Sequence, residues 1–119
     1  MLATKYRVPR QYIDYILKKG ESYTSKLFIV RYKTNRENFC RYRIVISKKV
    51  DPKAVKRNYL RRQSYEAIRL NLPTGQAGLP KNPTTGLDVI LITKKNAIKA
   101  SYKTIEEDLK NNIINRKHG

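Results

Sequence analysis

The segment 87–93 constrains the fold of this chain more than any other part of the sequence, because five of its seven residues are Leu, Val or Ile. A near-continuous apolar run of this length is typical of a strand in the centre of a sheet, buried on both faces. We therefore expect an α/β (α+β) fold in which helices cover this strand.

The rest of the chain predicts helices and strands around that strand. The hydrophobic periodicity and the positions of Gly and Pro predict, in order, a helix over 9–19, strands over 26–32 and 39–47, a helix over 51–72, a long loop over 73–86, the strand over 87–93 and a helix over 104–114. The polar residues between the first two strands predict a turn and thus an antiparallel hairpin. Asp51 is expected to cap the second helix, Pro52 to begin it, and Thr104 with Glu107 to form a capping box for the last helix.

Length and composition exclude several classes of protein. The chain has 119 residues, which suits a single domain over 1–119 with a short tail over 115–119. Its one cysteine, Cys40, excludes an internal disulfide, and its one histidine, His118, lies beside the C-terminus, a poor place for a metal ligand or a catalytic base. The sequence contains no apolar segment long enough to cross a bilayer and no secretory signal, so we expect a cytoplasmic protein without a membrane partner.

The charge of the chain indicates a polyanionic partner. There are 27 Lys and Arg against 9 Asp and Glu, a net charge of +18. Such a surplus opposes compaction by self-repulsion, and nucleic acid is its usual partner. Nine basic residues fall within 41–62, where the only acid is Asp51, so the charge lies in a periodic, folded segment rather than in a tail.

The predicted second helix separates a narrow core face from a basic one. At 100° per residue the core face comprises Leu60, Ser64, Ala67, Ile68 and Asn71. The adjacent side comprises Arg57, Asn58, Arg61, Arg62, Tyr65 and Arg69. Arg can bind phosphate through its forked donors, Asn can reach a 2′-OH or a base edge, and Tyr can stack on a base. This pattern favours an RNA-binding helix over an ordinary solvated face, which would mix charges of both signs.

No arrangement of residues predicts protein-based catalysis. The adjacent acids Glu106, Glu107 and Asp108 would point in different directions on a helix and fit its positive N-terminal end. A metal-dependent nuclease needs several converging carboxylates, which the other acids do not provide. We therefore predict no catalytic residue and no metal ligand in this chain. Cys40 is expected to be a small packing residue, and the nine Tyr could either stack on bases or fill the core.

The basic segment resembles the signature of the bacterial ribonuclease P protein component. Ser47-Lys48-Lys49 followed by 54–62, which reads AVKRNYLRR, is similar to that family's Ser-Lys-Lys strand end and Arg-Asn helix. The similarity extends over about residues 10–114, through Gly20, Phe28, Arg41, the segment 88–95 and Ser101-Tyr102.

This resemblance implies an α-β-β-α-β-α sandwich with a left-handed βαβ crossover. It also implies a subunit of the ribonucleoprotein that removes the 5′ leader of precursor tRNA. In that enzyme the RNA subunit is catalytic and requires Mg²⁺, while the protein is expected to bind no cofactor of its own and to raise the affinity for precursor. The residues expected to bind the RNA subunit are Lys48, Lys49, Lys56, Arg57, Asn58, Arg61, Arg62 and Arg69. Those expected to bind the leader, in a cleft between the first helix and the sheet, are Ile13, Leu17, Ile29 and Arg31.

The sequence also departs from the family pattern. Tyr59 occupies a position where the family has Arg, and the typically aromatic cleft positions are Ile13, Leu17 and Arg31. Either Tyr12 or Tyr15 substitutes for the missing aromatic rings, or Arg31 binds the leader phosphates instead.

Two other functions stay open at this point. A small ribosomal or other structural RNA-binding protein would share the charge, although such proteins often have long basic tails. A self-sufficient nuclease is disfavoured by the small number of acids.

Overall fold

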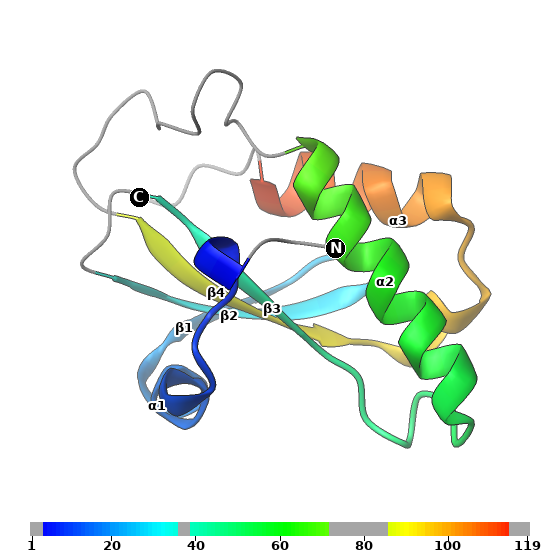
Figure 1. Cartoon of the computed structure of the whole chain (residues 1–119), viewed down its shortest axis with the longest axis horizontal. Coiled ribbons are helices and arrows are strands. Elements are labelled where there is room, and N and C mark those ends of the chain that lie inside the picture. Colours follow the sequence, from blue (N-terminus) through cyan, green and yellow to red (C-terminus); the bar gives the residue numbers. More distant parts are fainter. Residues whose placement is uncertain (1–3, 36–38, 72–85, 115–119) are drawn as a thin grey trace.

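A four-stranded mixed sheet forms the centre of the computed structural model (Figure 1). The structure describes residues 4–35, 39–71 and 86–114, so the predicted tail over 115–119 and nearly all of the predicted loop over 73–86 lie outside it. The elements are α1 (Ile13–Lys19), β1 (Glu21–Thr24), β2 (Phe28–Thr34), β3 (Arg41–Val45), α2 (Ala54–Asn71), β4 (Leu87–Thr93) and α3 (Tyr102–Leu109). Short turns of helix are η1 (Thr4–Tyr6), η2 (Arg10–Tyr12), η3 (Lys95–Lys99) and η4 (Lys110–Ile114).

The strand order β1-β2-β4-β3 corrects the predicted hairpin. β2 and β3 do not pair with each other. Instead, β4 lies between them, antiparallel to β2 and parallel to β3, with Leu91 opposite both Val30 and Ile44. The apolar run over 87–93 explains this order, because a strand that is buried on both faces is most stable with a neighbour on each edge. β3, α2 and β4 thus form a βαβ unit with adjacent parallel strands.

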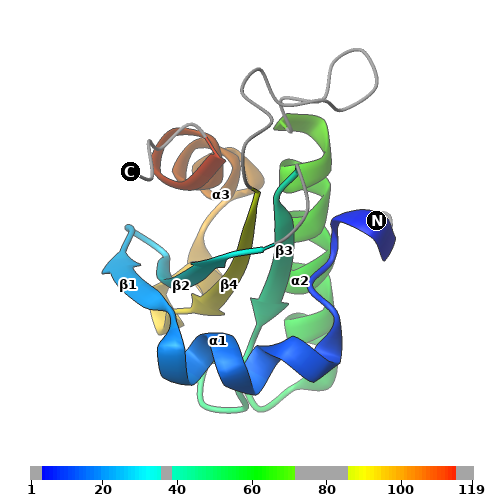
Figure 2. The ribbon, with the colours of Figure 1, turned by 90° about the vertical axis from the view of Figure 1, so that its left-hand side faces the viewer.

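Helices cover both faces of the sheet (Figure 2). α1 lies on one face, where Ile16 packs with Val8 and Ile90. α2 and α3 lie on the other face, over a larger core that contains Phe28, Leu91 and other buried side chains. The alternation of side chains along β4 supplies both cores, because Val89 and Leu91 point to one face while Ile90 and Ile92 point to the other.

The ends of the helices differ from the predictions. α2 begins at Ala54, and Asp51 instead accepts a hydrogen bond from the Lys53 amide at 2.8 Å within the preceding turn. α3 begins two residues before Thr104, since Ser101 is its N-cap and accepts a hydrogen bond from the Thr104 amide. The predicted capping box is therefore wrong. Gly20 ends α1 as predicted, and a Cβ there would lie 2.5 Å from the Ile16 carbonyl oxygen, so a larger residue does not fit.

The first predicted strand is in fact preceded by another. β1 pairs antiparallel with β2, with Tyr23 opposite Val30. Three of its four residues are exposed, so this edge strand lacks the alternation of apolar residues that identifies a strand from sequence. The element order is therefore α-β-β-β-α-β-α rather than α-β-β-α-β-α.

Candidate nucleic-acid interface

The outer side of α2 and the loop before it carry a basic surface, which we call the basic ridge. It comprises Lys48, Lys49, Lys56, Arg57, Asn58, Arg61 and Arg62. Leu60, Ser64, Ala67 and Ile68 are buried against the sheet and α3, as the helical pattern predicted. This burial fixes the rotation of α2, so the basic side chains between these positions lie at or near the surface.

Internal hydrogen bonds hold the ridge in place. Arg57 is half-buried, and its Nη1 donates to the Asp51 carbonyl oxygen at 2.8 Å, which ties the loop after β3 to α2. Arg61 Nη1 donates to Asn58 Oδ1, also at 2.8 Å. A guanidinium has five N–H donors, so both Arg side chains keep donors for phosphate. Asn58 is committed to orienting Arg61 in this conformation.

The two lysines of the Ser-Lys-Lys motif begin the ridge. Lys48 and Lys49 are exposed in a tight turn after β3. Ser47 stabilises that turn, since its Oγ accepts from the Lys49 amide at 3.2 Å and its carbonyl oxygen accepts from the Val50 amide at 3.0 Å. The motif is therefore a structural turn that presents two cations next to the start of α2.

Two residues of the predicted basic side differ from the others. Tyr65 is only 2% exposed, and its hydroxyl oxygen accepts from the Ile44 amide at 3.1 Å, so it joins the core and cannot stack on a base. Arg69 forms an ion pair with Glu66 and lowers the pKa of that carboxyl group through hydrogen bonding and charge. Arg69 also lies about 18 Å along the helix from Arg57. Its charge is thus offset by Glu66, and it lies about 10 Å along the helix beyond Arg62, the last residue of the ridge.

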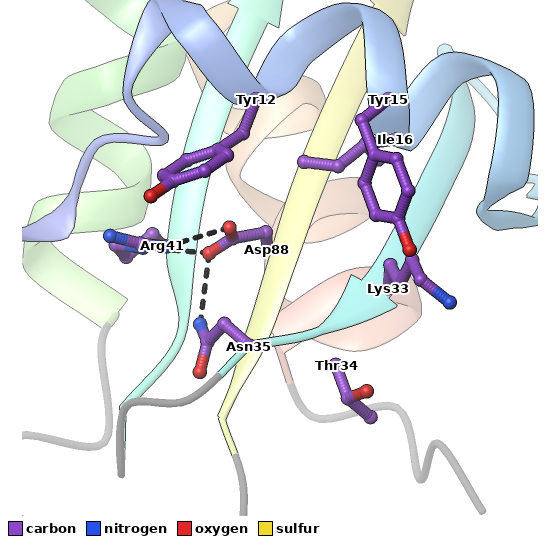
Figure 3. A pocket seen from close by; sticks show the side chains of 8 residues that line it. All are labelled: Tyr12, Tyr15, Ile16, Lys33, Thr34, Asn35, Arg41 and Asp88. Carbon is purple, nitrogen blue, oxygen red and sulfur yellow. Dashed lines mark hydrogen bonds and ion pairs between the residues drawn. The ribbon is translucent and has the colours of Figure 1, made fainter.

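A cavity of about 710 Å³ lies between α1 and the end of β2, on the other face of the sheet (Figure 3). We call it the α1 cleft. Its lining residues are Tyr12, Tyr15, Ile16, Lys33, Thr34, Asn35, Arg41 and Asp88.

A buried ion pair forms the polar wall of the α1 cleft (Figure 3). Arg41 binds Asp88 through two bonds of 2.7 Å, from Nε to Oδ1 and from Nη2 to Oδ2. Asn35 Nδ2 donates to the same carboxylate at 2.8 Å. The Arg41 guanidinium also lies 5.7 Å from the Tyr12 ring centroid, so the ion pair supports that ring from below.

Aromatic rings and a lysine form the outer rim of the cleft. Tyr12 and Tyr15 are 42% and 52% exposed, although both are large side chains. Lys33 Nζ lies 5.6 Å from the Tyr15 ring centroid. Exposed rings beside cations are suited to stack unpaired bases and bind the adjoining phosphates.

The predicted leader residues do not line this cleft. Ile13 and Leu17 pack against the small core formed by Val8, Ile16 and Ile90. Arg31 donates from Nη2 to the Leu17 carbonyl oxygen, and Ile29 is 39% exposed farther back along β2. The rotation of α1 explains the difference, because it turns Tyr15 and Ile16 toward the cleft, which Tyr12 joins from the end of η2. The alternative in which Tyr12 or Tyr15 supplies the aromatic surface agrees with this geometry.

Two of the three adjacent acids on α3 form hydrogen bonds within the fold. Asp108 is buried and accepts hydrogen bonds from Ser25 Oγ and the Leu27 amide, both at 2.9 Å. Glu106 accepts from Asn71 Nδ2 at 3.0 Å. Within the described ranges, His, Cys, Asp and Glu side chains nowhere gather in threes that could hold a metal ion. The Cys40 thiol is half-buried, and burial raises its pKa.

No helix in the described part of the chain is both long and apolar enough to span a membrane.

Comparison with known proteins identifies relatives over most of the chain. A family model described as Ribonuclease P matches residues 5–117. The ribonuclease P protein component of Clostridium botulinum (strain 657 / Type Ba4) is 34% identical over 97 residues, which cover 82% of this chain and 80% of that protein. That of Clostridioides difficile (strain 630) is 31% identical over 96 residues, covering 81% and 77%.

Solved structures agree with the sequence matches. The RNase P protein from Thermotoga maritima superimposes with a TM-score of 0.76 at 28% identity, covering 95% of this chain and 98% of that one. The RNase P protein from Staphylococcus aureus superimposes with a TM-score of 0.63 at 28% identity, covering 100% of both chains.

Proposed function

Since the chain belongs to the ribonuclease P protein family, we propose that it holds precursor tRNA against the RNA subunit by using two separate surfaces. The chain is a protein subunit of ribonuclease P, an RNA-based enzyme, and its partner is therefore the ribonuclease P RNA. In our proposal the basic ridge binds that RNA, and the α1 cleft holds the single-stranded 5′ leader of the precursor.

The basic ridge suits a folded RNA backbone. Its cations come from a hydrogen-bonded turn and one helix, so the backbone sets where each side chain starts before RNA binds, which lowers the entropy lost on binding. Arg57 and Arg61 are already oriented by hydrogen bonds of 2.8 Å. Arg–phosphate contacts position an RNA without reading its sequence, as a permanent partner requires.

The α1 cleft suits a leader of variable sequence. Exposed Tyr12 and Tyr15 offer surfaces on which any base can stack, and Lys33 lies beside them. Asp88 offsets the charge of Arg41, so the polar wall of the cleft offers oriented hydrogen-bonding groups and little net charge. The exposure of these two rings in the α1 cleft is therefore the observation that carries the leader assignment.

In this proposal the protein acts by binding and does not break a bond. Its positive charge offsets phosphate repulsion between precursor and RNA subunit, and the RNA subunit holds the Mg²⁺ that the reaction requires. The described acids support this division of labour, because Asp88 and Asp108 are engaged in structural hydrogen bonds. We place the reaction in the cytoplasm, where precursor tRNA is transcribed.

The test is reconstitution with the RNA subunit at low Mg²⁺, with affinity measured for precursor tRNA and for mature tRNA. The wild-type protein is expected to favour the precursor. Tyr12→Ala combined with Tyr15→Ala should lower precursor affinity about 5- to 150-fold per stacked base, and leave mature tRNA affinity unchanged. Leu70→Ala removes another exposed apolar side chain, on α2, and should change neither affinity.

Ile29→Ala separates the two leader paths. If this variant loses the preference for precursor and the double Tyr variant keeps it, the leader lies along β2 near Ile29 and Arg31, and the α1 cleft is not its site.

A further inference from the structure

A second hollow lies on the face of the molecule opposite the α1 cleft, between α2 and the junction of η3 with α3. Its volume is about 770 Å³. We call it the α2–α3 groove, and its lining includes Val55, Lys56, Tyr59, Arg62, Lys99 and Tyr102. The hollow lies on the opposite flank of α2 from Arg57 and Arg61, so the basic ridge continues around the helix through Lys56 and Arg62.

The floor of the groove exposes apolar surface on an otherwise polar helix flank. Val55 is 78% exposed and Tyr59 is 59% exposed, although a charged side chain would be fully hydrated at either of these helical positions. They lie four residues apart and so on one side of α2. Tyr102 lines the same hollow from the first turn of α3. An isolated exposed apolar residue is ordinary, but a paired exposed aromatic and aliphatic surface in a hollow marks a binding surface.

The rim of the groove is cationic. Lys56, Arg62 and Lys99 line it together with one acid, Asp51, whose Oδ1 already accepts the Lys53 amide. An aromatic floor within a cationic rim matches an unpaired nucleotide, whose base stacks on the ring while its phosphates meet the cations. An apolar protein partner would instead require the three cations to be desolvated, which is costly without paired acids.

We propose that the α2–α3 groove binds one unpaired nucleotide of the ribonuclease P RNA, with its base stacked on Tyr59 and its phosphates held by Lys56, Arg62 and Lys99. This inference rests on the proposed function, because it extends the RNA contact of the basic ridge onto the next side of α2.

The test compares variants of Tyr59 in binding the RNA subunit of the same organism. Tyr59→Phe keeps the ring and should bind within about twofold of the wild type. Tyr59→Leu keeps apolar volume without the ring and should bind about 5- to 150-fold more weakly, the range measured for loss of one stacked base. Leu70→Ala, on the same helix but outside the groove, is the matched control and should bind as the wild type does. Thermal melting of each free variant checks that the exposed substitutions leave the fold intact.

Fluorescence gives a second, independent measurement. The chain contains no Trp, so Tyr59→Trp introduces a single indole at the groove. Adding the RNA subunit should quench the indole emission through stacking. The Tyr59→Trp protein should still bind the RNA subunit tightly, because the substitution keeps an aromatic ring.

The outcomes separate this inference from the proposed function. If Tyr59→Leu binds as tightly as Tyr59→Phe, and the indole emission is unchanged in the RNA complex, the groove inference is wrong while the proposed function stands. If the wild-type protein does not bind the RNA subunit, both are wrong. If the indole emission changes on concentrating the RNA-free protein and sedimentation shows a dimer, the groove is an interface between two copies of the chain and the nucleotide assignment is overturned.

Discussion

Single residues in this protein take structural roles that their neighbours in sequence do not reveal. Asp108 belongs to a run of three acids on α3, yet it alone is buried, at 3% exposed. Its two oxygens accept hydrogen bonds from Ser25 Oγ and from the backbone amides of Lys26 and Leu27. The carboxylate therefore fixes the turn between β1 and β2, more than 80 positions away in the chain.

Replacing Asp108 should destabilise the fold without touching either RNA-binding surface. Asp108→Ala leaves buried donors of the β1–β2 turn without acceptors, and we expect a loss of about 3 kcal/mol in the free energy of unfolding. The measurement is urea denaturation of the RNA-free protein. Glu107→Ala, an exposed neighbour on the same helix, should change that free energy by less than about 0.5 kcal/mol. Equal losses for both variants would show that the charge of α3, and not the turn, sets the stability.

At the scale of the element, α2 connects the core with the surface. Leu60, Ala67 and Ile68 bury one side of it, and this burial decides which of the remaining side chains face outward. Tyr65 shows how broad the buried side is, because a residue at the edge of the predicted basic stripe joins the core. The helix thus presents Arg57 and Arg61 on one flank and Tyr59 on the other.

Removing two cations from α2 should weaken assembly more than removing two cations elsewhere. Arg57→Ala combined with Arg61→Ala is expected to lower affinity for the RNA subunit at least about tenfold, because charge-assisted hydrogen bonds are lost. If each Arg binds one phosphate, a plot of log affinity against log salt should become shallower by about 1.4 to 1.8. Filter binding over a salt series measures both quantities.

The control variant has the same net charge as the double Arg variant. Lys103→Ala combined with Lys110→Ala removes two exposed cations from α3 and η4, away from the basic ridge. A loss of affinity and of salt slope as large as that of the α2 variant would mean that total charge, and not the ridge, drives assembly.

At the scale of the whole molecule, two opposing demands act on one small chain. The net charge of +18 attracts RNA over long distances, but the like-charged side chains also repel one another within a domain of 119 residues. The sheet withstands this repulsion because β4 joins both neighbouring strands and contributes to the cores on both faces. Most of the charge lies on the outside of that framework, where solvent screens it.

Salt should therefore change the stability of the free protein and of its RNA complex in opposite directions. From about 0.01 to 0.15 M salt the Debye length falls from about 30 to 8 Å, so repulsion within the free protein is screened and its melting temperature should rise. Over the same range the affinity for the RNA subunit should fall steeply, because the counterions released on binding enter a more concentrated salt solution and their release is less favourable. Thermal melting and filter binding in the same buffers test this. A melting temperature that falls with salt would show that favourable ion pairs, such as that of Arg41 with Asp88, outweigh the repulsion.

Much of the fold could be predicted because its signals are local. The helical stripe of Leu60, Ser64 and Ile68 indicated which side of α2 would be buried, and these side chains are buried. The motif at 47–49 and 54–62 likewise identified the family, which the comparisons confirm. The residue-level binding roles stay predictions.

Other features depended on parts of the chain that are far apart in sequence. The pairing of β4 between β2 and β3, the bond of Asp108 to the β1–β2 turn and the packing of the Tyr12 ring beside Arg41 all join segments more than 25 positions apart. The sequence by itself determined the type of most elements, the buried side of α2 and the positive charge that indicates an RNA partner. Only the tertiary structure decided strand order, the lining of the cleft and the groove beside Tyr59, because periodicity within one element carries no information about which distant element packs against it.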